Sequence, residues 1–337
     1  MIHSVVTERK ILELRGGRNP VNPEVPGAFF VEPEATAAGP VEDVATLFLT
    51  NRECPFRCLY CDLWKNTTTT TVPPGAIPRQ IDHALERLPA ARHIKLYNSG
   101  NFFDAQAIPP DDHPEIARKV AQFQTVIVEN HPRLTGPACV RFRDLLHTAR
   151  REMDSHRVTP LPSHPMEFEV AMGLETVHPQ ILPSLNKQMT LDDFRRGAEY
   201  LKSHGIHARA FILLQPPYMP TDESVDWALR SLEFAFDCGI RVATVIPTRS
   251  GNGAVDALER IGEYTPPRLS QLEAVLERAI PWNRGRVFVD LWDAERFRDC
   301  PHCGAEQIRR LDEMNRRQTV LPKIGACPRP GCRRNSG

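Results

Sequence analysis

Residues 44–62 have the sequence VATLFLTNRECPFRCLYCD, which places three cysteines directly after a short apolar segment. Cys54, Cys58 and Cys61 follow the spacing C-x3-C-x2-C, so one loop can direct three thiolates at a common centre. A [4Fe–4S] cluster normally takes four cysteine ligands, and three would leave one iron open to another molecule. A zinc knuckle would need a fourth ligand, and no Cys or His follows closely. This stretch therefore favours an iron–sulfur cluster over a zinc site or a chance group of buried thiols.

The chain has 337 residues, enough for one large domain or two smaller ones. Lys plus Arg number 42, as do Asp plus Glu, and this balance excludes a uniformly basic coat for nucleic acid. No apolar run approaches the roughly 18–20 residues that span a bilayer, and the N-terminus lacks the apolar core of a secretion signal. We therefore expect a cytoplasmic protein whose nine cysteines are metal ligands or buried thiols.

Short segments rich in Val, Ile, Leu and Phe recur along the chain and alternate with helical patterns. Their weak polar–apolar alternation is typical of buried parallel strands. We expect strands at residues 44–50, 93–99, 125–130, 168–175, 207–214 and 242–248, with a seventh candidate at 286–292, and helices at 77–88, 114–123, 136–150, 190–204 and 221–238. This order predicts the α/β class, and the lack of a Gly-x-Gly-x-x-Gly turn favours a partial (β/α)6 TIM-like barrel over an open sheet.

Three regions are predicted from these patterns. Residues 1–43 form an N-terminal extension, in which the apolar residues 29–31 are expected to dock on the main body. Residues 44–292 form the barrel, and residues 293–337 form a small module rich in Cys and Arg.

The C-terminal module carries two cysteine pairs, Cys300 with Cys303 and Cys327 with Cys332. Two such pairs are typical of a four-cysteine zinc ribbon, and an auxiliary iron–sulfur cluster is the competing interpretation. Zinc is favoured because small four-cysteine knuckles most often hold it. Residues 305–337 hold eight basic and three acidic side chains, so this module either grips RNA or is an ordinary solvated tail.

Other reactive residues carry weaker signals. Cys139 and Cys238 fall within helical patterns and are expected to be buried core thiols. His131 follows the third strand and either lines a substrate pocket or is an ordinary loop histidine. The sequence has no Walker loop and no Gly-x-Ser-x-Gly elbow, which argues against phosphoryl or acyl transfer.

The cysteine spacing after a first strand resembles the radical SAM superfamily. The resemblance implies that the open iron binds the amino and carboxylate groups of S-adenosylmethionine (SAM). It further implies that electron transfer cleaves SAM to methionine and a 5′-deoxyadenosyl radical, which abstracts hydrogen from a substrate. An external electron donor such as flavodoxin or ferredoxin is then expected as a partner. No interaction with a membrane is expected.

The resemblance also implies SAM contacts at the carboxyl ends of the strands, where barrel active sites lie. An aromatic residue precedes the third cysteine, a turn after the second strand would bind the amino group, and a Gly-Leu-Glu segment would face the ribose or methionine. Lys187 would contact the SAM carboxylate, and Pro247 in the sixth strand would flank the adenine of SAM. The expected contacts are Tyr60, Ser99, Gly100, Asn101, Glu175, Lys187 and Pro247.

Within the superfamily, the chain is similar to the radical SAM subunits of archaeosine synthases, in the group with elongator-type and methylthiotransferase-type enzymes. Matching stretches lie at residues 97–104, 126–132, 169–190, 211–217 and 264–269. That family acts on a lysine adduct of a 7-deazaguanine in tRNA, and the chain departs from it in the cysteine loop and the C-terminal module. Two other hypotheses are a radical SAM enzyme that acts on a small molecule or peptide with an auxiliary iron–sulfur cluster, and a non-catalytic zinc-binding adaptor for nucleic acid.

Overall fold

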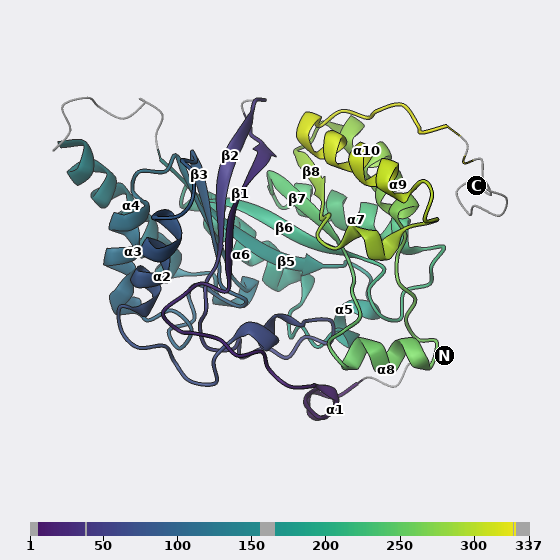
Figure 1. Ribbon diagram of the computed structural model, residues 1–337, viewed down its shortest axis with the longest axis horizontal. Helices are drawn as coiled ribbons and strands as arrows, with labels where there is room; N and C mark the ends of the chain where they lie inside the picture. Colours follow the sequence, from purple (N-terminus) through teal and green to yellow (C-terminus); the bar gives the residue numbers. More distant parts are fainter. Residues whose placement is uncertain (1–5, 38, 156–165, 326, 328–337) are drawn as a thin grey trace.

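The computed structural model describes residues 6–37, 39–155, 166–325 and 327. Its centre is one curled sheet of eight strands in sequence order, with helices packed around it (Figure 1). The strands are β1 (Ala28–Ala35), β2 (Val41–Phe48), β3 (His93–Tyr97), β4 (Thr125–Glu129), β5 (Glu167–Glu175), β6 (His207–Leu214), β7 (Val242–Pro247) and β8 (Arg286–Val289). Strand β1 is antiparallel to β2, and every later pair is parallel. The predicted α/β class and half-barrel are confirmed.

The sheet differs from the expectation at both edges. Strand β1 was not expected, since residues 28–35 were placed in an extension, and the seventh candidate strand is real but ends at Val289 rather than at residue 292. Glu and Pro residues within AFFVEPEA weaken the strand signal, and such residues are typical of an edge strand.

Helices cover the outer face of the sheet and bury the apolar side of each parallel strand (Figure 1). On β5, for example, Phe168, Val170 and Met172 belong to the core shared with the helices. The helices are α1 (Glu8–Leu14), α2 (Ala76–Leu85), α3 (His113–Val120), α4 (Pro137–Ser155), α5 (Ile181–Ser184), α6 (Leu191–Ser203), α7 (Ser224–Asp237), α8 (Ala254–Arg260), α9 (Leu269–Ala279) and α10 (Gly304–Arg317). Cys139 and Cys238 lie in this core, as expected.

Helix α6 shows why the predicted helices form where they do. Thr190 accepts a hydrogen bond from the backbone N–H of Asp193 at 3.1 Å, and the Asp193 carboxylate accepts one from the Thr190 N–H at 2.8 Å. This capping box satisfies two backbone donors that would otherwise lack partners.

Ion pairs fill the interior of the half-barrel near the amino ends of the strands. Glu34 on β1 pairs with Lys95 on β3 at 2.6 Å and with Arg209 on β6 at 3.0 Å, and Arg209 also pairs with Glu169 on β5. Burial favours a neutral carboxyl, but the nearby Arg209 and Lys95 charges hold the pKa of Glu34 well below its usual range. These ion pairs occupy the interior at the amino ends of the strands; they are formed by Glu34, Lys95, Glu169 and Arg209. The carboxyl ends of the strands therefore remain as the place for a site.

Helix α10 protects the free edge of β8. Asn315 exchanges hydrogen bonds with the backbone of Val289 at 2.9 and 2.8 Å, and Gln318 does the same with Val287 at 2.8 and 3.0 Å. Side-chain amides thus satisfy a strand edge that could otherwise pair with another chain.

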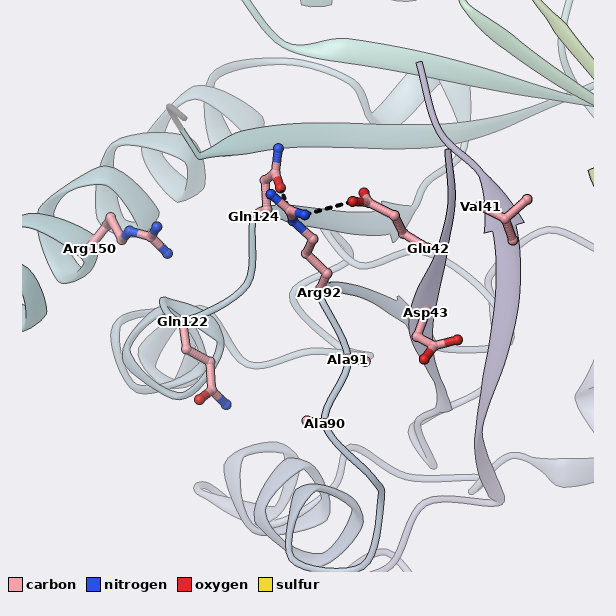
Figure 2. Close-up of a pocket in the computed structure, with 9 residues that line it drawn as sticks. All are labelled: Val41, Glu42, Asp43, Ala90, Ala91, Arg92, Gln122, Gln124 and Arg150. Atoms are coloured by element: carbon pink, nitrogen blue, oxygen red, sulfur yellow. Dashed lines mark hydrogen bonds and ion pairs between the residues drawn. The ribbon is translucent and has the colours of Figure 1, made fainter. Parts of the chain in front are cut away.

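A hollow of about 520 Å³ lies at the amino ends of β2, β3 and β4 (Figure 2). Arg92 crosses it and donates hydrogen bonds to Glu42 at 2.7 Å and Gln124 at 2.5 Å. None of the residues that line it was expected to bind a ligand, and it lies at the opposite end of the strands from the cysteine loop. Among the described residues, no helix combines the length and apolarity needed to cross a bilayer.

Candidate metal centre

The loop that carries Cys54, Cys58 and Cys61 follows β2 and is tied to two other loops at the carboxyl end of the sheet. Asn186, after β5, donates a hydrogen bond to the Arg57 carbonyl at 2.6 Å. Asn252, after β7, donates to the Leu59 carbonyl at 2.8 Å and is itself fully buried. Polar side chains therefore fix the backbone between the cysteines.

Charge also anchors the first turn of the cysteine loop. Glu53 accepts hydrogen bonds from Arg15 at 2.6 Å and from Arg18, and it pairs with Arg57 at 3.2 Å. Arg57 in turn donates to the Cys54 carbonyl. Residues of the N-terminal segment thus help to hold the loop, which the sequence did not suggest.

Cys58 is buried, Cys54 and Cys61 are half-buried, and all three thiols resist ionisation. Burial raises the pKa of Cys54 to about 11 and raises the pKa of Cys58 and Cys61 as well, and each thiolate would repel the others. The sulfurs do not form a group that lies within 4.8 Å, whereas one such group exists elsewhere among the described residues. A metal centre that binds here must displace the protons of these thiols.

A buried ion pair lies beside the thiols. Lys187 contacts Glu175 at 2.6 Å and the Tyr60 hydroxyl at 3.5 Å. Burial acts to lower the pKa of Lys187, but the charge of Glu175 outweighs it and holds this pKa above its usual range. The structure thus brings together three of the residues expected to contact SAM.

Backbone geometry places Glu175. The register of β5 shifts between Gly173 and Glu175, and Glu175 has a φ of +67°, in the left-handed region. A Cβ on Gly173 would lie 2.0 Å from the Glu175 carboxylate and 2.3 Å from Lys187 Nζ. Only glycine leaves room for the pair at this position.

The turn after β3 approaches the first cysteine closely. A Cβ on Gly100 would lie 3.2 Å from the Cys54 Cβ, and Ser99 has a φ of +53°. Asn101 donates a hydrogen bond from Nδ2 to the Cys54 sulfur at 3.1 Å, and its Oδ1 accepts one from the His131 N–H at 2.7 Å. Both amide atoms of Asn101 therefore have protein partners.

His131 is a buried member of the same network. Its ring stacks on Phe56 with centroids 3.8 Å apart, Nδ1 accepts from the Arg133 N–H at 3.2 Å, and Nε2 lies 3.0 Å from the Lys187 carbonyl. Burial and the Lys187 charge lower the pKa of His131 to about 3, so the ring is neutral. It lies in the loop after β4, where its stacking on Phe56 contacts the cysteine loop and its Nε2 contacts the loop after β5. A role in lining a substrate pocket stays a prediction.

Two residues near the site were missed by the sequence analysis. Asn98 is fully buried, and neither polar atom of its side chain has a hydrogen-bond partner among the described residues. Glu129, at the end of β4, accepts hydrogen bonds from the Asn98 N–H at 2.6 Å and the Gly100 N–H at 3.2 Å, and burial raises its pKa. The sequence signal that could have identified these two residues is a polar residue at or directly after the end of a buried strand.

Pro247, another expected SAM contact, is the last residue of β7, and its carbonyl accepts a hydrogen bond from Arg249.

The second cysteine group is compact and lies at the start of α10. The sulfurs of Cys300 and Cys327 are 3.7 Å apart, those of Cys300 and Cys303 are 3.5 Å apart, and all three residues are buried. Cys332 lies outside the described residues, as does the basic end of the tail. The structure therefore brings together three of the four cysteines expected in this group.

Comparisons with known proteins agree with the expected resemblance. The chain is 25% identical over 190 residues to archaeosine synthase subunit beta of Methanosarcina acetivorans, which covers 55% of this chain and 50% of that protein. It is 26% identical over 164 residues to the protein of the same name from Thermococcus kodakarensis, covering 47% and 46%. The chain thus spans about half the length of the curated relatives it matches.

Solved structures and family searches complete this comparison. Streptococcus suis SuiB bound to S-adenosylmethionine matches 73% of this chain and 51% of that chain, with a TM-score of 0.47 and 11% identity. No protein-family description matches the chain.

Proposed function

We propose that this protein is a radical SAM enzyme whose [4Fe–4S] cluster is held by Cys54, Cys58 and Cys61. The observation that carries the proposal is the position of these thiols, on one partly buried loop at the carboxyl end of the sheet, beside the Glu175–Lys187 pair. When bound, the cluster supplies the electron that cleaves SAM to methionine and a 5′-deoxyadenosyl radical.

The residues around the loop fit such a cluster with SAM on its open iron. Three thiolates are the donor set that leaves one iron open. Asn98 presents a fully buried amide without a partner among the described residues, and a bound polar molecule would satisfy it. Gly173 makes room for the two buried charges themselves, because a Cβ there would lie 2.0 Å from the Glu175 carboxylate.

The polar residues divide the recognition of SAM among them. The Lys187 ammonium suits the SAM carboxylate, and Glu175 suits the hydroxyls of the ribose or the amino group. Ser99 and Gly100 bring their backbone to the amino group, Tyr60 borders the cluster, and Pro247 flanks the adenine. Because Lys187 and Glu175 already face each other, SAM binding must share or replace their contact.

Reductive SAM cleavage tests the proposal. Wild-type protein, purified without oxygen and treated with SAM and dithionite, should hold about four irons in this cluster and release 5′-deoxyadenosine. Cys58→Ala should do neither, whereas Cys139→Ala, which removes a buried thiol in α4, should do both. Wild-type iron content and 5′-deoxyadenosine release by Cys58→Ala would contradict the proposal.

The proposed substrate is a modified 7-deazaguanine nucleoside in tRNA. Support comes from the two relatives named archaeosine synthase subunit beta, and the word subunit in that name supports a second protein as partner. Flavodoxin or ferredoxin would serve as electron donor, and iron–sulfur chemistry with reduced thiols suits the cytoplasm. Incubation with tRNA that carries the lysine adduct should yield a formamidine product. Turnover of a small molecule or peptide, with no reaction on tRNA, would favour the alternative class of substrate.

The second cysteine group is proposed to hold one zinc ion, with Cys332 as its fourth ligand. A tetrahedral ion with Zn–S bonds of about 2.3 Å separates its sulfurs by about 3.8 Å, which is close to the observed 3.5 and 3.7 Å. An auxiliary iron–sulfur cluster binds each thiolate to a different iron and needs wider spacing. RNA binding by the basic tail would add a second contact with the tRNA substrate. A second four-iron cluster, or a disulfide among these cysteines, would contradict the zinc assignment.

A further inference from the structure

We propose that Asn101 is a positioning residue that acts through Cys54, because its side-chain N–H donates a hydrogen bond to the thiolate and makes the cluster easier to reduce. The inference rests on the proposed cluster. It gives Asn101 a different task from the SAM contact expected from the sequence.

The orientation of the Asn101 amide follows from its two partners. Asn101 is 3% exposed, and its Nδ2 lies 3.1 Å from the Cys54 sulfur. On the other side is the backbone N–H of His131, at 2.7 Å, which can only donate. The atom that faces His131 must therefore be the oxygen, and the NH2 group must face the sulfur.

The support behind Asn101 is rigid. His131 is held by its stacking on Phe56 and by hydrogen bonds at both ring nitrogens, one of them to the Lys187 carbonyl. Gly100 allows the turn before Asn101 to approach the Cys54 backbone, with 3.6 Å between its ideal Cβ position and the Cys54 Cα. These contacts keep the donor aimed at the sulfur and leave it little freedom to turn elsewhere.

The effect on the cluster follows from charge. One-electron reduction adds negative charge that is shared by the thiolate sulfurs, and an N–H dipole aimed at a sulfur stabilises the more negative state. The low dielectric of a buried site strengthens this interaction. Removing the donor should therefore make reduction less favourable, and no bond is made or broken at Asn101.

The test compares two buried asparagines that are adjacent to His131 in space or sequence. Asn101→Ala removes the donor to the sulfur, whereas Asn130→Ala removes an amide that bonds only the Phe103 N–H and the His131 carbonyl in the described structure. Both proteins would be reconstituted without oxygen and titrated with dithionite, with the reduced cluster followed by electron paramagnetic resonance. We expect about a tenfold smaller reduction constant for Asn101→Ala, which is about 59 mV for a one-electron couple, and a wild-type value for Asn130→Ala.

Three further readouts separate the possible failures. SAM affinity measured by calorimetry should stay within about twofold of wild type in Asn101→Ala, whereas a direct SAM contact would weaken it about tenfold or more. If Asn101→Ala does not retain iron, Asn101→Leu fills the same volume without the amide donor or an added charge, and it should also be harder to reduce. Wild-type potentials in both Asn101 variants would overturn this inference alone. Absence of a cluster in wild-type protein would instead overturn the proposed function.

Discussion

The two cysteine groups of this protein use the same residue type, yet their spacing in the chain and their surroundings differ. Cys54, Cys58 and Cys61 are spread out on a loop fixed from three sides, next to a buried lysine–glutamate pair. Cys300, Cys303 and Cys327 gather within 4.8 Å at the start of a helix that seals the sheet edge. This difference supports the proposal that the first group binds an iron–sulfur cluster and that the second binds a single zinc ion.

Removing one ligand from each group should have the largest effect. Cys58→Ala should lose all iron of the first centre and all SAM cleavage while keeping zinc. Cys303→Ala should lose zinc and keep the first centre, because the two groups lie on different loops. Metal analysis of both variants checks this. Loss of the same metal from both variants would contradict the prediction that the two groups bind different metals.

Each group also has a buried ion pair nearby, and the pair beside the second group should govern folding. Arg310 pairs with Glu273 at 2.9 Å and with Glu277 at 2.8 Å. Arg310→Met removes the cation from the buried Glu273, which keeps its hydrogen bond from Gln307, and from the half-buried Glu277. It should therefore lower the free energy of unfolding by about 3–5 kcal/mol. Arg278→Met, which breaks an exposed pair with Asp226, should cost at most about 1 kcal/mol. Denaturant unfolding measures both, and equal losses would mean that burial does not matter here.

The pair beside the first group should instead govern ligand binding. Glu175→Gln removes one charge from this buried pair and should weaken SAM binding by about 10–150-fold, because a charge-assisted hydrogen bond is worth about 1.5–3 kcal/mol. Iron content and its absorption should not change. Calorimetry without oxygen gives the SAM dissociation constant. An unchanged constant would assign Glu175 to the scaffold.

The smallest expected effect is the pH dependence of thiol alkylation in the metal-free protein. Burial raises the pKa of Cys54 to about 11, so its thiolate fraction should still rise about tenfold from pH 9 to pH 10. Alkylation of Cys54 by iodoacetamide, followed by mass spectrometry, should rise accordingly. The alkylation rate of glutathione should level off over the same pH range, because its exposed thiol is already mostly ionised there. If the Cys54 rate levels off near pH 9, its thiol is not shielded.

Local patterns in the sequence were sufficient to predict the parallel strands and the first cysteine loop, because buried strands and ligand spacing are encoded by neighbouring residues. The partners of β1 were not predictable in this way. Glu34 meets Lys95 and Arg209, which are far away in the chain, and this contact exists only once the sheet curls.

Residue type and position were likewise insufficient to assign Asn101. Its place after β3 predicts a SAM contact, which stays a prediction. That its amide also reaches the Cys54 sulfur depends on the close approach of Gly100 to Cys54, which only the folded structure shows. In the same way, residues 293–337 were placed in a metal module, and only the tertiary structure reveals that Asn315 and Gln318 hold the edge of β8.

X-ray absorption at the iron and zinc edges of one wild-type sample tests the central claim most directly, since it examines both cysteine groups at once. We predict iron with sulfur ligands and short iron–iron distances, and zinc with four sulfurs at about 2.3 Å and no neighbouring metal. Zinc in both groups, or iron clusters in both, would contradict the claim that this chain builds two different metal centres.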